Sequence, residues 1–385
     1  MTSPAADDAP SPHRRILCIV VALILYGSLY PWQFYARHYY RSPLWILVHA
    51  WPSNLDRYVV WDVAVNVVLY LPLGVFGFLA VRRTASLIAR IGLPLLLGLL
   101  LSSAIEMIQL FDDSRMCSLS DVASNVAGAA VGIAAGAIYR KAFDHLLSRR
   151  PAAALLRPSG ALLLLACFVG YQVFPLFPSW GRTSLIRKVG ALAHSAFSPA
   201  DALLGFAEWL TVACLVESVI KTKTSRVMAV ILLLLPARLL IAGRSLAWAD
   251  VAGAAVAFAV WLCVPRRVVR RAAPLLLAAA LIVGELAPFH FQGAQPFNWV
   301  PFRGYFQTAW QDGFVVLFRK SFWYGGVLWL WRAAGVRLAW ITGITALALF
   351  LLERVQIYLP GRTPEITDAL QAILMGVLLW ILRDT

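Results

Sequence analysis

The stretch EMIQLFDDSRMCSLSD at residues 106–121 recurs as ERVQIYLPGRTPEITD at residues 353–368. Both copies read E-x2-Q-x5-R-x5-D, so four polar residue types stand at identical spacing. A shorter version of this pattern, an arginine followed six residues later by an aspartate, joins Arg244 to Asp250. Apolar segments precede the arginine and follow the aspartate in every case. A recurring hairpin of this kind predicts an architecture built from internal repeats.

The composition of the chain predicts an all-α membrane protein. Of its 385 residues, 61% are hydrophobic and 14% are charged, and the mean hydropathy is +0.74. These values are too apolar for a soluble globular protein. The net charge of +15 comes from basic residues in short clusters near the ends of apolar runs. Such clusters indicate membrane orientation rather than a nucleic-acid surface, so no nucleic-acid partner is expected.

Apolar runs predict a polytopic α-helical protein with about twelve spans, because about 20 apolar residues cross the hydrocarbon core as a helix. The predicted spans are residues 16–32, 59–81, 91–111, 120–139, 159–177, 199–219, 226–243, 248–265, 272–289, 314–332, 337–358 and 366–382. They divide into three parallel four-helix repeats. The predicted units are residues 1–150, 151–271 and 272–385.

The distribution of basic residues predicts how the chain is oriented in the cell membrane. Clusters such as Arg82-Arg83 and the run from Arg266 to Arg271 orient a chain with its positive side inside. Both termini are therefore expected in the cytoplasm, and every Arg-to-Asp loop on the outer face. The first apolar run is not followed by small residues, so it is expected to remain as an uncleaved helix.

Polar residues concentrate in the first predicted unit and recur in the third. In three helices of the first unit two polar residues stand three or four positions apart, so each pair shares one helix face. Ionisable groups at the end of a membrane helix indicate a functional or pairing site. The predicted outward-facing pocket contains Asp62, Asn66, Glu106, Gln109, Arg115, Asp121 and Asn125. The corresponding candidates in the third unit are Glu353, Gln356, Arg362 and Asp368.

The pattern of the first unit resembles a known family. It reads D-x3-N-x5-P-x-G from Asp62 to Gly74, then E-x2-Q, then R-x2-S-x-S-D-x3-N-x2-G from Arg115 to Gly128. This pattern resembles the VanZ-like membrane family, named for an accessory factor in resistance to the glycopeptide teicoplanin. The resemblance covers roughly residues 26–136 and implies a role in the cell envelope.

The other two units depart from this pattern. The third matches in part, through Gly326, Glu353, Gln356, Arg362, Thr367 and Asp368, and it has Ala372 in place of the last asparagine. In the second unit the glutamate, glutamine and asparagine positions hold Leu235, Arg238 and Ala254. The first unit is therefore the one expected to carry function.

The sequence favours a non-enzymatic protein whose outer pocket binds an anionic lipid-linked or glycopeptide-like ligand. The expected partner is a membrane lipid or a lipid-linked envelope precursor, and a contribution to teicoplanin resistance is implied by the resemblance alone. An arginine at the water boundary suits phosphate or carboxylate, and carboxylates and amides suit sugar hydroxyls. The alternatives are a membrane enzyme with Glu106 or Asp121 as general base, and a transporter.

The polar residues and the cysteines and glycines allow further expectations. A purely structural alternative has Arg115 and Asp121 joined by a salt bridge and a helix cap, with Thr363 and Pro364 opening the last helix. No cofactor or metal is expected, because the histidines lack a second ligand at metal spacing and no nucleotide-binding motif is visible. The five cysteines form no pattern of disulfides. A stripe formed by Gly128 and the glycines that follow it predicts close helix packing.

Overall fold

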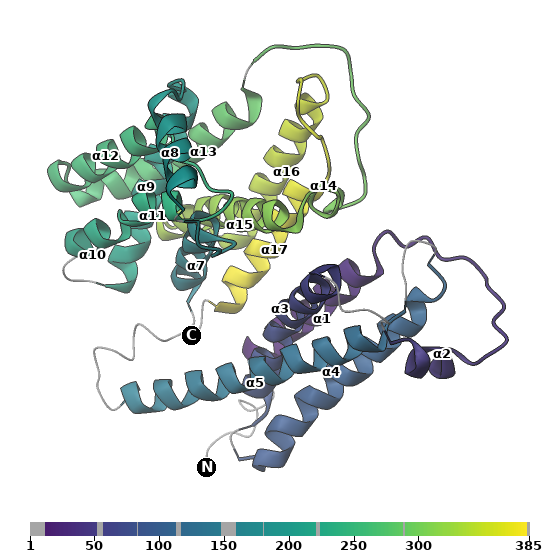
Figure 1. The fold of residues 1–385 in the computed structure, drawn as a ribbon. Coiled ribbons are helices and arrows are strands. Elements are labelled where there is room, and N and C mark those ends of the chain that lie inside the picture. The colour runs from purple at the N-terminus through teal and green to yellow at the C-terminus, as the bar shows by residue number, and fades with distance from the viewer. Residues whose placement is uncertain are drawn as a thin grey trace. The chain divides into compact units, whose positions relative to one another are not determined.

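The computed structural model describes the chain in eight stretches that contain helices and loops (Figure 1). The described residues are 12–51, 57–82, 84–112, 117–147, 159–179, 181–220, 224–287 and 289–382. The chain divides into two compact units, Met1–Leu156 and Arg157–Thr385. The second unit contains both segments that the sequence assigns to a second and a third repeat. The division into three repeats stays a prediction.

The N-terminal unit is built from helices of very different length. They are α1 (Pro12–Leu29), α2 (Pro43–His49), α3 (Arg57–Ala80), α4 (Leu87–Gln109) and α5 (Leu119–Leu147). Ser42 and Ser86 cap α2 and α4 by accepting backbone N–H groups, because the first turn of a helix leaves its donors unpaired.

The C-terminal unit is described from residue 159 onward. Its helices are α7 (Gly160–Val173), α8 (Arg182–Ala193), α9 (Pro199–Val219), α10 (Thr224–Ile231), α11 (Leu234–Ala237), η2 (Arg238–Leu240), α12 (Trp248–Cys263), α13 (Arg266–Leu286), α14 (Arg303–Gln307), α15 (Trp310–Ala333), α16 (Leu338–Gln356) and α17 (Thr367–Ile381). Among the described residues the extended pairings are isolated bridges rather than strands.

Each predicted span coincides largely with helical structure, but one of them is not a single continuous helix. The run at residues 226–243 is divided among α10, α11 and η2, because Pro236 lacks the N–H that a continuous helix needs. Six helical segments of the described chain are long and apolar enough to cross a membrane. They are Pro12–Leu29, Asp62–Ala80, Leu87–Gln109, Leu119–Ala142, Pro199–Val219 and Leu338–Gln356. Several membrane-spanning helices are thus supported, and the full number of twelve stays a prediction.

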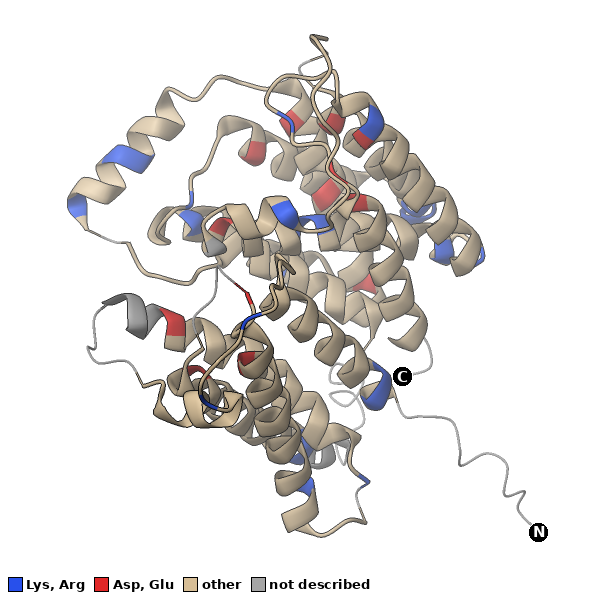
Figure 2. Cartoon of the chain, turned by 90° about the vertical axis from the view of Figure 1, so that its right-hand side faces the viewer, with Lys and Arg blue, Asp and Glu red and all other residues tan. Residues whose placement is uncertain are grey.

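Apolar side chains fill the cores and also cover much of the surface. Leu164, Phe168 and Phe322 are fully buried in the C-terminal unit. Ile88 on α4 and Ile138 on α5 are instead 84% and 69% exposed. Charged side chains are sparse along the helices, as the mostly tan ribbon of Figure 2 shows. Apolar side chains both inside and outside a helical unit are what a lipid solvent requires.

Glycines bring α3 and α5 into direct backbone contact, as their spacing predicted. A Cβ atom placed on Gly128 would lie 2.3 Å from the carbonyl oxygen of Val67. On Gly132 it would lie 2.1 Å from the carbonyl oxygen of Leu71. Small residues at every fourth position allow this approach, which is how membrane helices pack closely.

One local geometry recurs at the ends of α1, α7 and α13. At each place an aromatic or aliphatic residue has a left-handed backbone, and its N–H donates to the carbonyl three residues earlier. These residues are Trp32 (φ 61°), Leu176 (φ 67°) and Phe289 (φ 60°). Two residues later at the first two places, and nine residues later at the third, an isolated bridge joins the chain to the loop before α5, α12 or α17. The bridges are Phe34 with Asp112, Pro178 with Ile241, and Asn298 with Glu365. The same local geometry thus follows three separate helices, while the division into three repeats stays a prediction.

We expect cysteine labelling to place the Arg362 loop outside the cell. In a cysteine-free background, Thr363→Cys should react with a membrane-impermeant maleimide in intact cells, because basic clusters orient the chain. Both Thr363 and Ala334 are exposed, so either cysteine is accessible. Ala334→Cys, between α15 and α16, should react only after lysis. The reverse pattern would show that the predicted topology is wrong.

Candidate functional site

The glutamate of the repeated motif holds the loop that follows its helix. The Oε2 atom of Glu106 accepts the backbone N–H of Ser118 at 2.8 Å. The Oε2 atom of Glu353 accepts the backbone N–H of Glu365 at 2.9 Å. The separation is twelve residues in both copies, and both glutamates are 3% exposed. A buried backbone donor needs a partner, so each glutamate stabilises the turn into the next helix.

The glutamine of the motif joins its helix to the end of an earlier one. Gln109 donates through Nε2 to the carbonyl of Ser28 at 2.7 Å. Gln356 donates through Nε2 to the carbonyl of Glu285 at 3.2 Å and to its carboxylate at 2.8 Å. Carbonyls in the last turn of a helix lack intrahelical partners, so these contacts cap α1 and α13.

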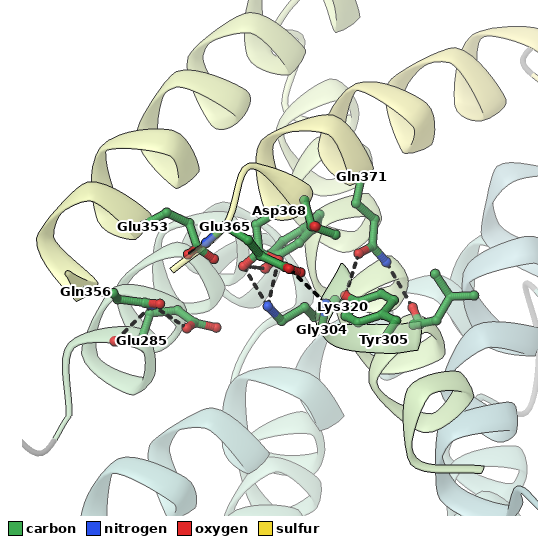
Figure 3. A network of polar contacts seen from close by, with 12 residues as sticks. Glu285, Gly304, Tyr305, Lys320, Glu353, Gln356, Glu365, Asp368 and Gln371 are labelled. Carbon is green, nitrogen blue, oxygen red and sulfur yellow. Dashed lines mark hydrogen bonds and ion pairs between the residues drawn. The ribbon is translucent and has the colours of Figure 1, made fainter. Parts of the chain in front are cut away.

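The aspartate of the third copy is neutralised within the protein (Figure 3). The Nζ atom of Lys320 on α15 lies 2.6 Å and 2.7 Å from the two carboxylate oxygens of Asp368. The hydroxyl of Tyr324 also donates to Asp368, at 2.6 Å. Asp368 is 1% exposed. An ion pair so well enclosed leaves this carboxylate little capacity for a ligand.

Further contacts of Figure 3 attach α17 and the loop before it to α14 and α15. Glu365 accepts the N–H of Gly304 at 3.0 Å. Gln371 accepts the hydroxyl of Tyr305 at 2.9 Å and donates to Ser321 at 2.9 Å. The third copy is thus a set of mutually satisfied polar groups, which makes it a structural centre of the C-terminal unit.

The arginine of the loop does not pair with its aspartate in either described copy. Arg362 donates to the carbonyls of Gly284 and Ala287 at 2.6 Å and 2.9 Å and lies 3.6 Å from the carboxylate of Glu285. Asp368 pairs with Lys320 instead.

The second loop differs from the expectation in the same way. Arg244 donates to the carbonyl of Tyr171, while Asp250 pairs with Arg238 at 3.3 Å. The Arg-to-Asp salt bridge, which is the structural alternative for Arg115 and Asp121, does not form in these two described loops, because the arginine caps the last turn of an earlier helix. The expectation that Thr363 and Pro364 open the last helix is also wrong, since α17 begins at Thr367. Arg115 lies outside the described residues.

The first unit brings its aspartates together without a lysine. Asp121, in the first turn of α5, lies beside Asp62 and Asn66 of α3, and the Ser120 hydroxyl is 3.3 Å from its Oδ1. Asp62 is exposed. Within the described ranges neither aspartate forms an ion pair. The Nδ2 atom of Asn66 is buried without a hydrogen-bond partner.

Asn125 lies one turn further along α5 and is 6% exposed. Its Nδ2 donates to the hydroxyl of Ser102 on α4 at 2.9 Å, and its Oδ1 has no hydrogen-bond partner. The first unit therefore offers a carboxylate pair and two amides whose hydrogen-bonding capacity is only partly used internally. We call Asp62, Asn66, Asp121 and Asn125 the open polar cluster.

Several residues of these networks were not predicted from the sequence. They are Ser102, Glu285, Lys320, Tyr324, Glu365 and Gln371. A lysine in the interior of a long apolar run was the available signal for Lys320, because such a charge requires a partner. Nothing in the spacing pointed to the others.

Comparison with known proteins agrees with the motif of the first unit. Residues 16–140 match the family model VanZ/LLP1. This range includes α1, α3, α4, the motif of residues 106–121 and most of α5. No curated protein and no solved structure matches the chain. The N-terminal unit therefore contains a VanZ-like region, and the described chain contains several helices apolar and long enough to cross a membrane.

Proposed function

We propose that this protein is a non-enzymatic component of the cell envelope that binds an anionic lipid-linked or glycopeptide-like ligand at the open polar cluster. Through that ligand it would contribute to resistance to glycopeptides such as teicoplanin. The observation that carries the proposal is the difference between two aspartates at the same motif position. Asp368 is enclosed by Lys320 and Tyr324, whereas Asp121 faces a second carboxylate and a buried amide.

This difference favours a binding role for the first unit. Two neighbouring carboxylates repel one another, and a group arranged only for stability would be paired as Asp368 is. Buried polar atoms without partners, such as Nδ2 of Asn66 and Oδ1 of Asn125, also reduce stability. A bound ligand would satisfy these groups, and functional sites commonly carry such local destabilisation.

The chemistry of the cluster suits a ligand with several hydroxyl groups. The carboxylates of Asp62 and Asp121 and the Oδ1 atom of Asn125 are acceptors, and sugar hydroxyls donate to such groups. Arg115, on the strength of its sequence position, is proposed to hold a phosphate or carboxylate of the same ligand. A sugar attached to a membrane-anchored phosphate has both features.

Binding is favoured over catalysis by the role of Glu106. One of its carboxylate oxygens already accepts the backbone N–H of Ser118, as the equivalent glutamate does in the other copy. A general base must be free to take and release a proton near the substrate. A residue that fixes the turn before α5 is better explained as support for the site.

Asp62→Asn should weaken retention of the ligand by about tenfold, because a hydrogen bond to a charged group contributes about 1.5–3 kcal/mol. The protein would be purified from cells, its co-purified lipids identified by mass spectrometry, and teicoplanin susceptibility measured in a susceptible host. Susceptibility should rise with the loss of ligand. The matched control is Asp201→Asn, because Asp201 is also exposed and lies in the first turn of a different helix, α9. It should change neither the amount of retained ligand nor the susceptibility to teicoplanin.

Glu106→Gln distinguishes binding from catalysis in the same experiment. The glutamine carbonyl can still accept the Ser118 N–H, so a binding protein should keep part of both ligand and phenotype. Full retention of ligand with complete loss of the phenotype would favour an enzyme. Unchanged ligand and susceptibility in Asp62→Asn would contradict the proposal as a whole.

A further inference from the structure

Three arginines from separate segments of the C-terminal unit lie close together. Arg238 belongs to η2, Arg244 to the loop before α12, and Arg319 to α15. Burial lowers the pKa of the Arg244 guanidinium to about 10, and repulsion by Arg238 and Arg319 adds to the shift. The three positive charges therefore act on one another, and none is shielded by full exposure to water.

The arginines have fewer acceptors than their geometry allows. Arg238 pairs with Asp250 at 3.3 Å, and Arg244 donates to the carbonyl of Tyr171. Within the described part of the chain no acceptor is hydrogen-bonded to Arg319. The Nε atoms of all three side chains are buried without a hydrogen-bond partner. Each guanidinium has five N–H donors, so several donors of this cluster remain unused.

The nearest remaining carboxylate does not neutralise the cluster by direct contact. Glu208 on α9 is 6% exposed and accepts the hydroxyl of Tyr171 and the indole N–H of Trp323. Arg319 lies over the Trp323 ring, with its guanidinium carbon 4.9 Å from the ring centroid. Even with Asp250 and Glu208 both ionised, three cations face two anions. The cluster therefore keeps a net positive charge in an apolar unit.

The sequence shows why the second Arg-to-Asp loop differs from the other two. In the first and third copies a glutamate lies fifteen residues before the aspartate, and a glutamine lies twelve residues before it. Here these positions hold Leu235 and Arg238. One carboxylate is lost and one guanidinium is gained, so these two positions together are more positive than in the other copies by two formal charges at pH 7.

We propose that Arg238, Arg244 and Arg319 form a second binding site, which takes a phosphate group. Arginines with unused donors and an excess of positive charge inside an apolar helical unit are costly, and their default interpretation is a functional site. Planar guanidinium groups from three separate segments suit a phosphate, because each guanidinium can donate two hydrogen bonds to the phosphate oxygens. The phosphate belongs either to the headgroup of an anionic lipid or to a free ion. This site is separate in sequence and composition from the open polar cluster.

The indole of Trp323 provides a local probe because Arg319 lies over its ring. The full-length protein would be labelled with 5-fluorotryptophan in a neutral detergent, and the Trp323 resonance assigned with Trp323→Phe. Dioctanoyl phosphatidylglycerol should shift that resonance in a saturable way, whereas dioctanoylglycerol, which lacks phosphate, should not. Inorganic phosphate is titrated separately. A shift by the lipid alone assigns the site to a headgroup, and an equal response to inorganic phosphate assigns it to the free ion.

Arg319→Gln should weaken this binding at least about tenfold, the effect of losing a charge-assisted hydrogen bond. Arg319→Lys, which keeps the charge but not the fork of donors, should weaken it less. Arg332→Gln, in the last turn of the same helix, is the matched control and should bind as the wild type does.

A stability measurement separates this site from a structural role. Without phosphate, Arg319→Gln should leave the thermal unfolding midpoint unchanged or raise it, because one of three repelling charges is removed. A clear fall in the midpoint would show that Arg319 supports the fold and would overturn the proposal. The absence of a saturable shift with either phosphate probe, or equal affinity in Arg319→Gln, would overturn it as well.

Discussion

Lys320→Met is expected to lower the free energy of unfolding by about 3–5 kcal/mol, because it leaves the carboxylate of Asp368 buried without its cation. Asp368 is 1% exposed, and Lys320 contacts both of its oxygens. The loss would appear as a lower unfolding midpoint of the purified protein in detergent. Methionine keeps most of the volume of the lysine chain, so the change isolates the charge.

The double variant Lys320→Met/Asp368→Leu should recover much of this loss, because replacing both partners by apolar groups removes the unpaired charge. Lys141→Met, at an exposed lysine of α5, is the control and should change the free energy of unfolding by less than about 0.5 kcal/mol. A loss below about 1 kcal/mol for Lys320→Met would contradict the view that this ion pair is central to the unit.

Gly132→Val is expected to destabilise the N-terminal unit by about 3 kcal/mol or to prevent its folding, because overpacking forces backbone shifts. The added Cβ would lie 2.1 Å from the carbonyl oxygen of Leu71 and 2.9 Å from the N atom of Val75. Both are backbone atoms of α3 and cannot rotate away. The yield of monodisperse protein in size-exclusion chromatography and its unfolding midpoint measure the effect.

Gly92→Ala is the matched control for this substitution. Gly92 also lies inside a long apolar helix, but a Cβ there would meet nothing within 4 Å. Alanine loses less backbone entropy on folding than glycine, so Gly92→Ala should be neutral or stabilising by up to about 1 kcal/mol. Equal effects of the two substitutions would mean that α3 and α5 do not pack through Gly132.

The placement of the helices was largely predictable. A membrane requires long apolar helices with internally satisfied backbones, so the apolar runs marked where helices would form. The run at residues 226–243 was the exception, because Pro236 divides it. The glycine stripe predicted close helix packing but not its partner, which the structure shows to be α3.

The chemistry of the polar residues was predicted less completely. The repeated motif identified Glu106, Gln109 and Asp121 as a set, and the spacing of three residues placed Glu106 and Gln109 on one helix face. It did not show that Glu106 would hold the N–H of Ser118, or that Gln109 would cap α1 at Ser28. Those partners are distant in the sequence or belong to the backbone, which carries no residue-specific signal.

The sequence by itself determined the helical membrane class, the repeated motif and the relationship to the VanZ-like family, because hydropathy and spacing are local properties of the chain. Only the tertiary structure decided which charges are neutralised. Lys320 reaches Asp368 across 48 residues, and Arg319 lies with Arg238 and Arg244, because α15 packs against segments far from it in the chain. Pairing of charges depends on distances of a few ångströms in space, and these are set by packing rather than by order along the chain.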